Sequence, residues 1–404
     1  MIQGGALEGL RVIEFGEYIV PAYTTRLLAD YGAEVIKVER PPAGDVSRRH
    51  GPFPGDVPHP ERSGLFLYLN VNKLGITLDP ETATGRDLLR GLIAQADILV
   101  ENNPPAQLER WGLDYASLRR PNPGLVMTSC TVFGHQGPWR DYKGYAITAA
   151  AASGVAFRVG DPARNPLTMP YDRADYWGGI HAAAATVTAC MARERTGLGQ
   201  HVDISTADAI NTIINPLDYI TYVDTGAYPK RAGHRTIIQY PFTLLPCKDG
   251  YVAMMVAQDR HWQRFLELLG NPAWSKNPRY MDRFKVGTEY PQEMDDLLHP
   301  WLMEHTKREF WDLCRERKIP FQPVFTIDEV MAWEQLRFRG FWRPLEHPEA
   351  GTWTYPGPPF KMVKTPGSLR HAAPRLGEHN QLVYGGMLGV TSLEMTRLRQ
   401  SGIV

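Results

Sequence analysis

The 404-residue sequence is poor in cysteine and lacks the motifs that depend on it. Its four cysteines, Cys130, Cys190, Cys247 and Cys314, are scattered and form no Cys-x-x-Cys pair. This distribution argues against a zinc site and against a disulfide framework. We therefore expect buried free thiols and no bound metal.

An excess of one charge and long apolar runs are also missing. Lysine plus arginine number 44, and so do aspartate plus glutamate, so no global basic field attracts nucleic acid or a membrane surface. No apolar run approaches the roughly 20 residues of a membrane span, and the first residues lack the basic start and apolar core of a signal peptide. These absences predict a cytoplasmic protein with no nucleic-acid or membrane partner.

What the sequence does contain is a globular composition with repeated β-α-β order. Hydrophobic residues make up 43% and charged residues 22%, which at this length allows a full core and two domains. Leu10–Phe15 predicts a strand, Ala22–Tyr31 a helix and Glu34–Glu39 a second strand. Further strands are expected within 70–79, 97–102, 124–130 and 201–205, and helices within 80–96 and 178–195. The order predicts an α/β fold.

The turn after the first strand argues against a dinucleotide site. A dinucleotide-binding turn reads Gly-x-Gly-x-x-Gly, whereas this chain has Gly16-Glu-Tyr-Ile-Val-Pro21. Arg40 follows the second strand, at the carboxyl end where open α/β sheets bind ligands, so it is well placed to meet a phosphate. A merely solvated arginine is the alternative.

The segment around Asp175 is the candidate for chemistry. Asp175 precedes the alanine-rich helix expected from about Gly178, where free N–H groups and the helix dipole favour an ionised carboxylate. Gly178 and Gly179 would leave room for a ligand to approach the backbone. An ionised carboxylate in a crowded turn can be a nucleophile. On local sequence alone, the commoner role of such an aspartate is a helix cap.

Longer patterns resemble the family III coenzyme A transferases, which include formyl-CoA and carnitine CoA transferases. One pattern is Asp175-x-x-Gly-Gly, followed at helical length by Arg193-Glu-Arg-Thr-Gly-Leu-Gly-Gln-His-Val-Asp-Ile-Ser205. The opening, from Gly9-Leu-Arg-Val-Ile-Glu-Phe to Gly44-Asp45, and the ending from Leu376 are similar to the same family. The resemblance covers nearly the whole chain. It implies that Asp175 is the nucleophile.

The resemblance also implies a binding site for coenzyme A. Arg40 matches an arginine near the nucleotide part, Arg110 matches an arginine that contacts coenzyme A, and Tyr145 matches a position near the acyl group. The expected coenzyme A-binding residues are Arg40, Leu78, Asn102, Asn103, Arg110 and Tyr145. Family members often carry a basic residue shortly after Leu78-Asp79, where this chain has Glu81, so we expect redistributed diphosphate contacts. Aromatic residues near the expected site indicate a bulky or flat acid: Tyr18, Trp139, Tyr145, Tyr176 and Trp177.

The architecture implied by the resemblance is a Rossmann-like large domain built from both chain ends plus a smaller α+β middle domain. We expect the large domain over 1–215 and 345–404, the small domain over 228–330, and linkers at 216–227 and 331–344. Two chains of this family interlock as linked rings, so we expect a homodimer or a heteromer with a related chain. The glycine-rich loop that closes the site in formyl-CoA transferase has no counterpart in Arg231–Arg235, which predicts a different lid or none.

The implied activity is transfer of coenzyme A from an acyl-CoA donor to a carboxylic acid acceptor. Acyl-CoA and coenzyme A are substrates, and no permanent cofactor or metal is expected. Asp175 would attack the thioester, and the released thiolate would convert the mixed anhydride into an aspartyl-CoA thioester. Two alternatives stay open. One is an α-methylacyl-CoA racemase, which shares the fold and the aspartate but carries a histidine where this chain has Tyr145; the other is a supporting subunit of a heteromeric transferase.

Overall fold

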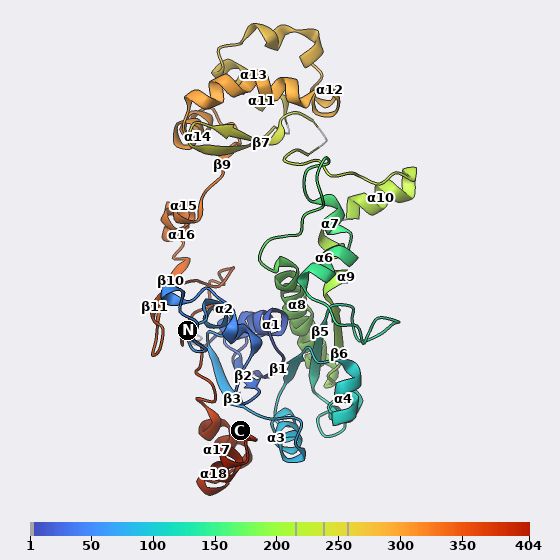
Figure 1. Ribbon diagram of the computed structural model, residues 1–404, viewed down its shortest axis with the longest axis vertical. Helices are drawn as coiled ribbons and strands as arrows, with labels where there is room; N and C mark the ends of the chain where they lie inside the picture. Colours follow the sequence, from blue (N-terminus) through green and yellow to red (C-terminus); the bar gives the residue numbers. More distant parts are fainter. Residues whose placement is uncertain (1–3, 215, 237–238, 257) are drawn as a thin grey trace. The chain divides into compact units, whose positions relative to one another are not determined.

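The computed structural model describes residues 4–214, 216–236, 239–256 and 258–404, which form two compact units (Figure 1). Unit 1 comprises Met1–Ala156, Thr168–Gly226 and Gln335–Val404. Unit 2 comprises Phe157–Leu167 and Ala227–Glu334. The domain bounds expected from the sequence stay a prediction.

Unit 1 is built on a six-stranded sheet of parallel strands in the order β3-β2-β1-β4-β5-β6 (Figure 1). Its strands are β1 (Arg11–Phe15), β2 (Glu34–Glu39), β3 (Lys73–Thr77), β4 (Ile98–Glu101), β5 (Val126–Thr131) and β6 (His201–Ser205). This is the order of doubly wound folds, whose two halves meet between β1 and β4. The expected α/β class and all six strands are confirmed.

Helices cover both faces of this sheet because the side chains of each strand alternate between them. On one face Ile13 and Leu99 share a core with α3, α4, α17 and α18. On the other face Val12 and Ile98 share a core with α1 and α8. The helices of unit 1 are α1 (Ile19–Asp30), α2 (Gly64–Leu69), α3 (Ala83–Ile93), α4 (Pro105–Trp111), α5 (Tyr115–Leu118), α6 (Ala146–Ala152), α8 (Arg173–Thr196), α9 (Thr206–Ile214), α10 (Pro216–Thr225), α17 (Asn380–Leu388) and α18 (Ser392–Gln400).

Three smaller features complete unit 1. The short 3-10 helices are η1 (Val46–Arg49) and η2 (Pro54–Asp56), and β10 (Trp342–His347) pairs with β11 (Gly351–Pro356) in an antiparallel hairpin. The C-terminal segment joins the sheet through Asn380, whose Oδ1 accepts from the Thr77 N–H at 2.8 Å, and through Tyr384, whose hydroxyl donates to the Thr77 carbonyl at 2.8 Å. Both chain ends therefore contribute to unit 1.

Helix α8 begins at Arg173, whereas the sequence analysis expected its start near Gly178, and this changes the role of two glycines. Asp175 lies inside the first turn rather than ahead of the helix. Gly178 and Gly179 are buried, and a Cβ on Gly179 would lie 3.2 Å from the Val20 carbonyl oxygen. They allow α8 to pack closely on α1, so the expectation that they make room for a ligand was wrong.

Unit 2 contains the expected hairpin and a helical layer. Strands β7 (Phe242–Cys247) and β8 (Gly250–Met255) are antiparallel, and β9 (Gln322–Pro323) pairs with β8. Its helices are α11 (Asp259–Leu268), η3 (Ala273–Lys276), η4 (Pro278–Tyr280), α12 (Arg283–Glu289), α13 (Pro291–Glu304), α14 (Lys307–Glu316) and α15 (Ile327–Ala332). Helices α7 (Val155–Arg158) and α16 (Glu334–Phe338) carry the chain across the boundaries of the units.

Two absences bear on function. All four cysteines are buried and free, as expected. Within the described ranges, no helix is long and apolar enough to cross a membrane. Helix α10 lies within the segment 216–227, which the sequence analysis expected to be a linker.

Candidate functional site

A pocket of about 690 Å³ opens in unit 1 where β1 and β4 end. This is the point at which the strand order reverses, the usual place for a ligand in an open α/β sheet. Its walls come from the segments that follow β1, β2 and β4, from η1, from residues 140–146 and from the start of α8. Five residues proposed from the sequence line it: Arg40, Asn102, Asn103, Tyr145 and Asp175.

Asp175 lies at the wall of this pocket in the first turn of α8. Its backbone N–H donates to the Asp172 carbonyl at 2.9 Å, and the residue is only 6% exposed. No side chain among the described residues donates a hydrogen bond to its carboxylate. Burial, with a smaller contribution from the charge of Asp172, raises the pKa of Asp175 to about 7. The expectation of a helix end that favours ionisation is thus corrected, since desolvation outweighs the 0.3–2 kcal/mol, roughly, that a helix end supplies.

Asn102 and Asn103 shape the pocket by fixing the loop between β1 and α1. The side-chain amide of Asn102 bonds both backbone groups of Glu17, accepting at 3.0 Å and donating at 2.9 Å. Asn103 donates to the Phe15 carbonyl at 2.9 Å. The Asn102 amide is therefore engaged through both its oxygen and its nitrogen, and the Asn103 amide through its nitrogen, so both side chains hold the loop before α1.

Arg40 lies at the pocket rim with its guanidinium half exposed. It is 3.8 Å from the Glu81 carboxylate and stacks over Trp111 at 5.6 Å. Glu81 is the residue at which this chain departs from the family pattern. Because the Glu81 carboxylate lies near the Arg40 guanidinium, it competes with a phosphate for that cation.

Tyr145 lines the pocket and is 72% exposed, so its side chain is not part of the core. Leu78 is fully buried in the hydrophobic core and Arg110 is exposed on α4, where it contacts Gln107. Neither Leu78 nor Arg110 lines the pocket. Of the aromatic residues expected nearby, only Tyr18 and Tyr145 do so.

The sequence analysis missed several charged residues of this pocket. They are Asp45, Arg49, His50, Arg140 and Lys143. Arg49 and Lys143 are exposed cations with no ion-pair partner among the described residues. The signal was their position: Arg49 lies four residues after Asp45 and Lys143 two residues before Tyr145, in stretches already matched to the family.

A buried ion network lies behind the pocket. Lys37 Nζ is 2.6 Å from Glu14 and 2.8 Å from Asp45, and Lys73 Nζ is 2.8 Å from Glu14. Burial alone would raise the pKa of Glu14, but the two ammonium groups outweigh it and lower the pKa to about 2. Removing one member would leave an uncompensated buried charge, so this network fixes Asp45 in place.

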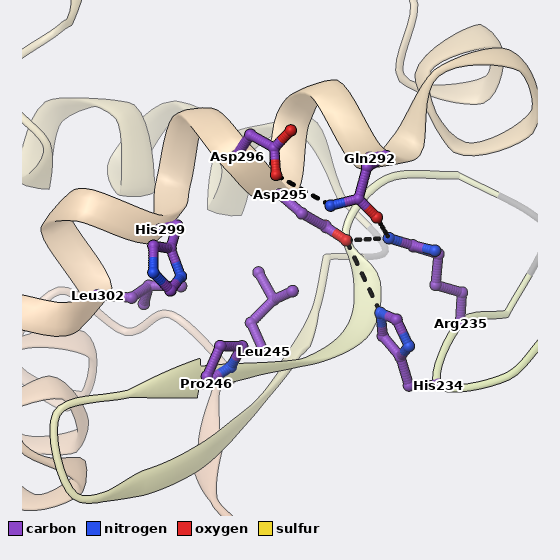
Figure 2. A pocket seen from close by; sticks show the side chains of 9 residues that line it. All are labelled: His234, Arg235, Leu245, Pro246, Gln292, Asp295, Asp296, His299 and Leu302. Carbon is purple, nitrogen blue, oxygen red and sulfur yellow. Dashed lines mark hydrogen bonds and ion pairs between the residues drawn. The ribbon is translucent and has the colours of Figure 1, made fainter.

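A second, smaller pocket of about 180 Å³ belongs to unit 2 (Figure 2). Asp295 there accepts from Tyr240 at 2.8 Å, contacts Arg235, and lies 3.7 Å from His234. Figure 2 shows Gln292 joining the same cluster through Arg235 and Asp296. The Asp295 carboxylate therefore has protein hydrogen-bond and ion-pair partners, whereas the Asp175 carboxylate has none among the described side chains. In the part of the chain that the structure describes, no cluster of three or more His, Cys, Asp or Glu side chains could hold a metal ion.

Comparison with known proteins identifies the family of this chain. The family model "CoA-transferase family III" matches residues 7–380. The succinate–glutarate CoA-transferase of Agrobacterium fabrum is 32% identical over 93% of this chain and 94% of that protein. The formyl-CoA:oxalate CoA-transferase of Afipia carboxidovorans is 31% identical over 98% of this chain and 97% of that protein.

One solved structure and two further relatives also belong to this group of proteins by their names. A CAIB/BAIF family protein from Brucella suis has a TM-score of 0.85 at 28% identity, over 95% of this chain and 100% of that chain. The beta and alpha subunits of succinyl-CoA–L-malate CoA-transferase from Chloroflexus aurantiacus are each 29% identical over 98% of this chain. The chain belongs to CoA-transferase family III and is a CoA-transferase enzyme.

Proposed function

We propose that Asp175 is the nucleophile of a coenzyme A transfer that proceeds through an aspartyl anhydride and an aspartyl thioester. The observation that carries this proposal is the contrast among the pocket's carboxylates. Asp45 accepts from Ser47 and pairs with Lys37, and Glu39 is held by Arg48. Asp175 is also buried, at 6% exposed, yet has no hydrogen-bond donor or cation on its carboxylate among the described side chains. Its oxygen lone pairs are free to attack.

The chemistry balances without any other group. One carboxylate oxygen of Asp175 attacks the thioester carbonyl carbon, the C–S bond breaks, and the electron pair leaves on the sulfur of coenzyme A. That thiolate attacks the aspartyl carbonyl and releases the first acid. The acceptor carboxylate then repeats the two steps in reverse. Positioning of carboxylate and thioester supplies much of the acceleration, roughly 7 to 11 kcal/mol in well-oriented cases.

Cations around the pocket rim support binding of the phosphates of coenzyme A. Arg40, Arg49 and Lys143 line it, and within the described ranges Arg40 has only the long contact with Glu81 as an ion pair. Arginine and lysine bind phosphate through charge-assisted hydrogen bonds. We assign Arg40 to this role within the pocket and keep Arg110, on α4, as an outer contact. Tyr145, exposed at the wall, is assigned to the acyl group.

Trapping the acyl-enzyme tests the nucleophile directly. Purified protein is incubated with an acyl-CoA and hydroxylamine, which captures an activated acyl group and converts the aspartate to a hydroxamate. We expect modification of Asp175 and none of Asp172, three residues away on the same peptide. Asp175→Asn should bind acyl-CoA yet lose transfer, since an amide forms no anhydride.

The same incubation in deuterated water separates the alternatives. An unlabelled Asp175 during turnover, together with deuterium entering the substrate α-carbon without coenzyme A exchange, would favour the racemase. Activity of the chain purified alone would exclude a merely supporting subunit. The acids in the names of the relatives, succinate, glutarate, oxalate, malate and citramalate, are the first acceptors to test.

We further propose that the active form is a homodimer of the interlocked kind. Helix α10 supports this, because none of its described residues is buried and it exposes large apolar side chains along its length. These are Leu217, Tyr219, Ile220, Tyr222 and Val223. An amphipathic or apolar helix needs a partner to cover it. A second copy of the chain is the occupant that the family resemblance implies.

A further inference from the structure

Tyr18 has a backbone conformation that is normally reserved for glycine. Its φ is 68° and its ψ is −139°, at the residue that precedes α1. A side chain in this region costs on the order of 1 to 3 kcal/mol and persists only where the surroundings impose it. The tyrosine lines the pocket of the proposed active site.

Two contacts impose this conformation. The Tyr18 N–H donates to both oxygens of Asp45, at 3.2 and 3.3 Å, and the Tyr18 hydroxyl donates to Asp172 Oδ2 at 2.8 Å. Asp45 is 1% exposed and cannot shift, because Lys37 and Ser47 hold its carboxylate. The buried network therefore fixes the backbone of Tyr18 through Asp45, and Asp172 accepts the hydrogen bond of the Tyr18 hydroxyl.

Asp172 is strained as well. Tyr171 and Asp172 have φ values of 57° and 51°, so two consecutive residues ahead of α8 have left-handed backbones. The Asp172 side chain makes no cap bond to its own helix, although its carbonyl accepts from the Asp175 N–H. Its carboxylate is used for Tyr18 instead of capping. Both partners of this hydrogen bond, Tyr18 and Asp172, have strained backbones, and the bond lies near the unpaired carboxylate of Asp175. Such strain at a pocket indicates a role in the chemistry.

We propose that Asp172 and Tyr18 form a positioning pair for the nucleophile: the Tyr18 hydroxyl holds the Asp172 carboxylate beside Asp175, so that its negative charge opposes the ionised nucleophile and is relieved by acylation. The inference rests on the proposed role of Asp175. Asp172 and Tyr18 act through that residue and need not touch the substrate.

The loss of the Asp175 charge on acylation explains why a neighbouring carboxylate would favour the reaction. Asp175 is buried and Asp172 is partly buried, so water only partly screens the repulsion between the two ionised carboxylates. When the Asp175 oxygen bonds to the thioester carbon and the C–S bond breaks, the negative charge departs with the sulfur of coenzyme A. Asp175 becomes neutral and the repulsion ends. A repulsion that is present before attack and absent afterwards favours the acyl-enzyme.

Other charged or titratable groups line the same pocket, namely Glu17, Glu39, Arg40, Asp45, Arg49, His50, Arg140, Asp141, Tyr142, Lys143 and Tyr145. On α8 Tyr176 follows Asp175, and α1 presents Tyr23, whose ring lies 5.0 Å from that of Tyr176. From the end of η1, His50 lies with its ring 5.2 Å from Tyr18. The segment before α6 brings Lys143 and Tyr145 to the pocket wall, while α9 contributes the neutral Thr206. The charge of Asp172 adds to burial in raising the pKa of Asp175.

The test is the pH profile of kcat/KM for acyl-CoA in Asp172→Asn, which keeps an acceptor for Tyr18 and removes the charge. We expect the acidic limb to move to lower pH by about one unit and kcat at high pH to fall about tenfold, with KM unchanged. Tyr18→Phe frees the Asp172 carboxylate and should shift the limb in the same direction by less. Tyr176→Phe, which removes a phenol from the same helix without touching this bond, is the control and should keep the wild-type limb.

The outcomes separate this inference from the proposed function. If hydroxylamine labels Asp175 in the wild type but both Asp172→Asn and Tyr18→Phe keep the wild-type acidic limb, the positioning pair is refuted and the nucleophile stands. If Asp175 is not labelled, both fail together. Should Asp172→Asn not fold, as judged by circular dichroism, Tyr18→Phe decides the matter alone.

Discussion

Replacing Asp175 with asparagine should stabilise the protein, and more so at high pH. The pKa of Asp175 lies at about 7 in the folded chain, raised by burial from an ordinary value of 3.8. A folded-state pKa above the unfolded one means that the folded state holds the extra proton between these two values. The stability that this carboxyl contributes is therefore complete below about pH 4. It falls as the pH rises, and above about pH 7 the full cost of burying a charge remains.

The magnitude follows from the size of this pKa change. Each pH unit corresponds to about 1.4 kcal/mol, so the full cost has an upper limit on the order of 4 kcal/mol. Between pH 5 and pH 8.5 we expect on the order of 2 kcal/mol of it to appear, since the carboxylate keeps some contact with the pocket solvent. Asp175→Asn carries no such cost. At roughly 2 °C per kcal/mol, its advantage in Tm over wild type should grow by about 4 °C between these pH values.

Thermal unfolding of both proteins at pH 5 and pH 8.5 measures this difference. Asp141→Asn is the matched control, because Asp141 lines the same pocket but is exposed and paired with Arg140. It should give the same Tm difference from wild type at both pH values. A Tm advantage of Asp175→Asn that does not grow with pH would refute the reasoning, because it would mean that the carboxylate is solvated in the folded protein.

Further substitutions test the binding site and the assembly. Arg40→Ala should raise the KM for acyl-CoA about tenfold or more at unchanged stability, since a charge-assisted hydrogen bond contributes roughly 1.5 to 3 kcal/mol. Arg110→Ala should raise this KM by a smaller factor. Wild-type KM values in both variants would contradict the assignment of these arginines to the phosphates. Glu81→Gln should lower that KM about two- to fivefold by freeing Arg40 from an exposed ion pair worth roughly 1 kcal/mol or less, and a raised KM would show that Glu81 aids binding. Sedimentation should find no folded monomer of the wild type at micromolar concentration, whereas Leu217→Lys combined with Ile220→Lys should weaken the dimer; a stable, active wild-type monomer would end the dimer proposal.

Sequence periodicity was sufficient for the sheet and insufficient for some helices. The buried parallel strands are apolar runs bounded by turn residues, as in Glu34–Glu39, and each was located to within a few residues. Helix α10 lies in a segment that was expected to be a linker, because Pro216 and Gly226 flank it. Helix α13 was missed, since Pro300 interrupts its pattern.

By itself the sequence determined the family, the α/β class and the identity of the candidate nucleophile, because these depend on short patterns and their order along the chain. Only the tertiary structure decided which candidates share a pocket, because Asp175, Asn102 and Arg40 come from separate segments that meet only at the ends of parallel strands. It also decided the electrostatics. Whether a carboxylate is ionised depends on its burial and its neighbours, and the hydrogen bond that places Asp172 beside Tyr18 joins residues 154 positions apart.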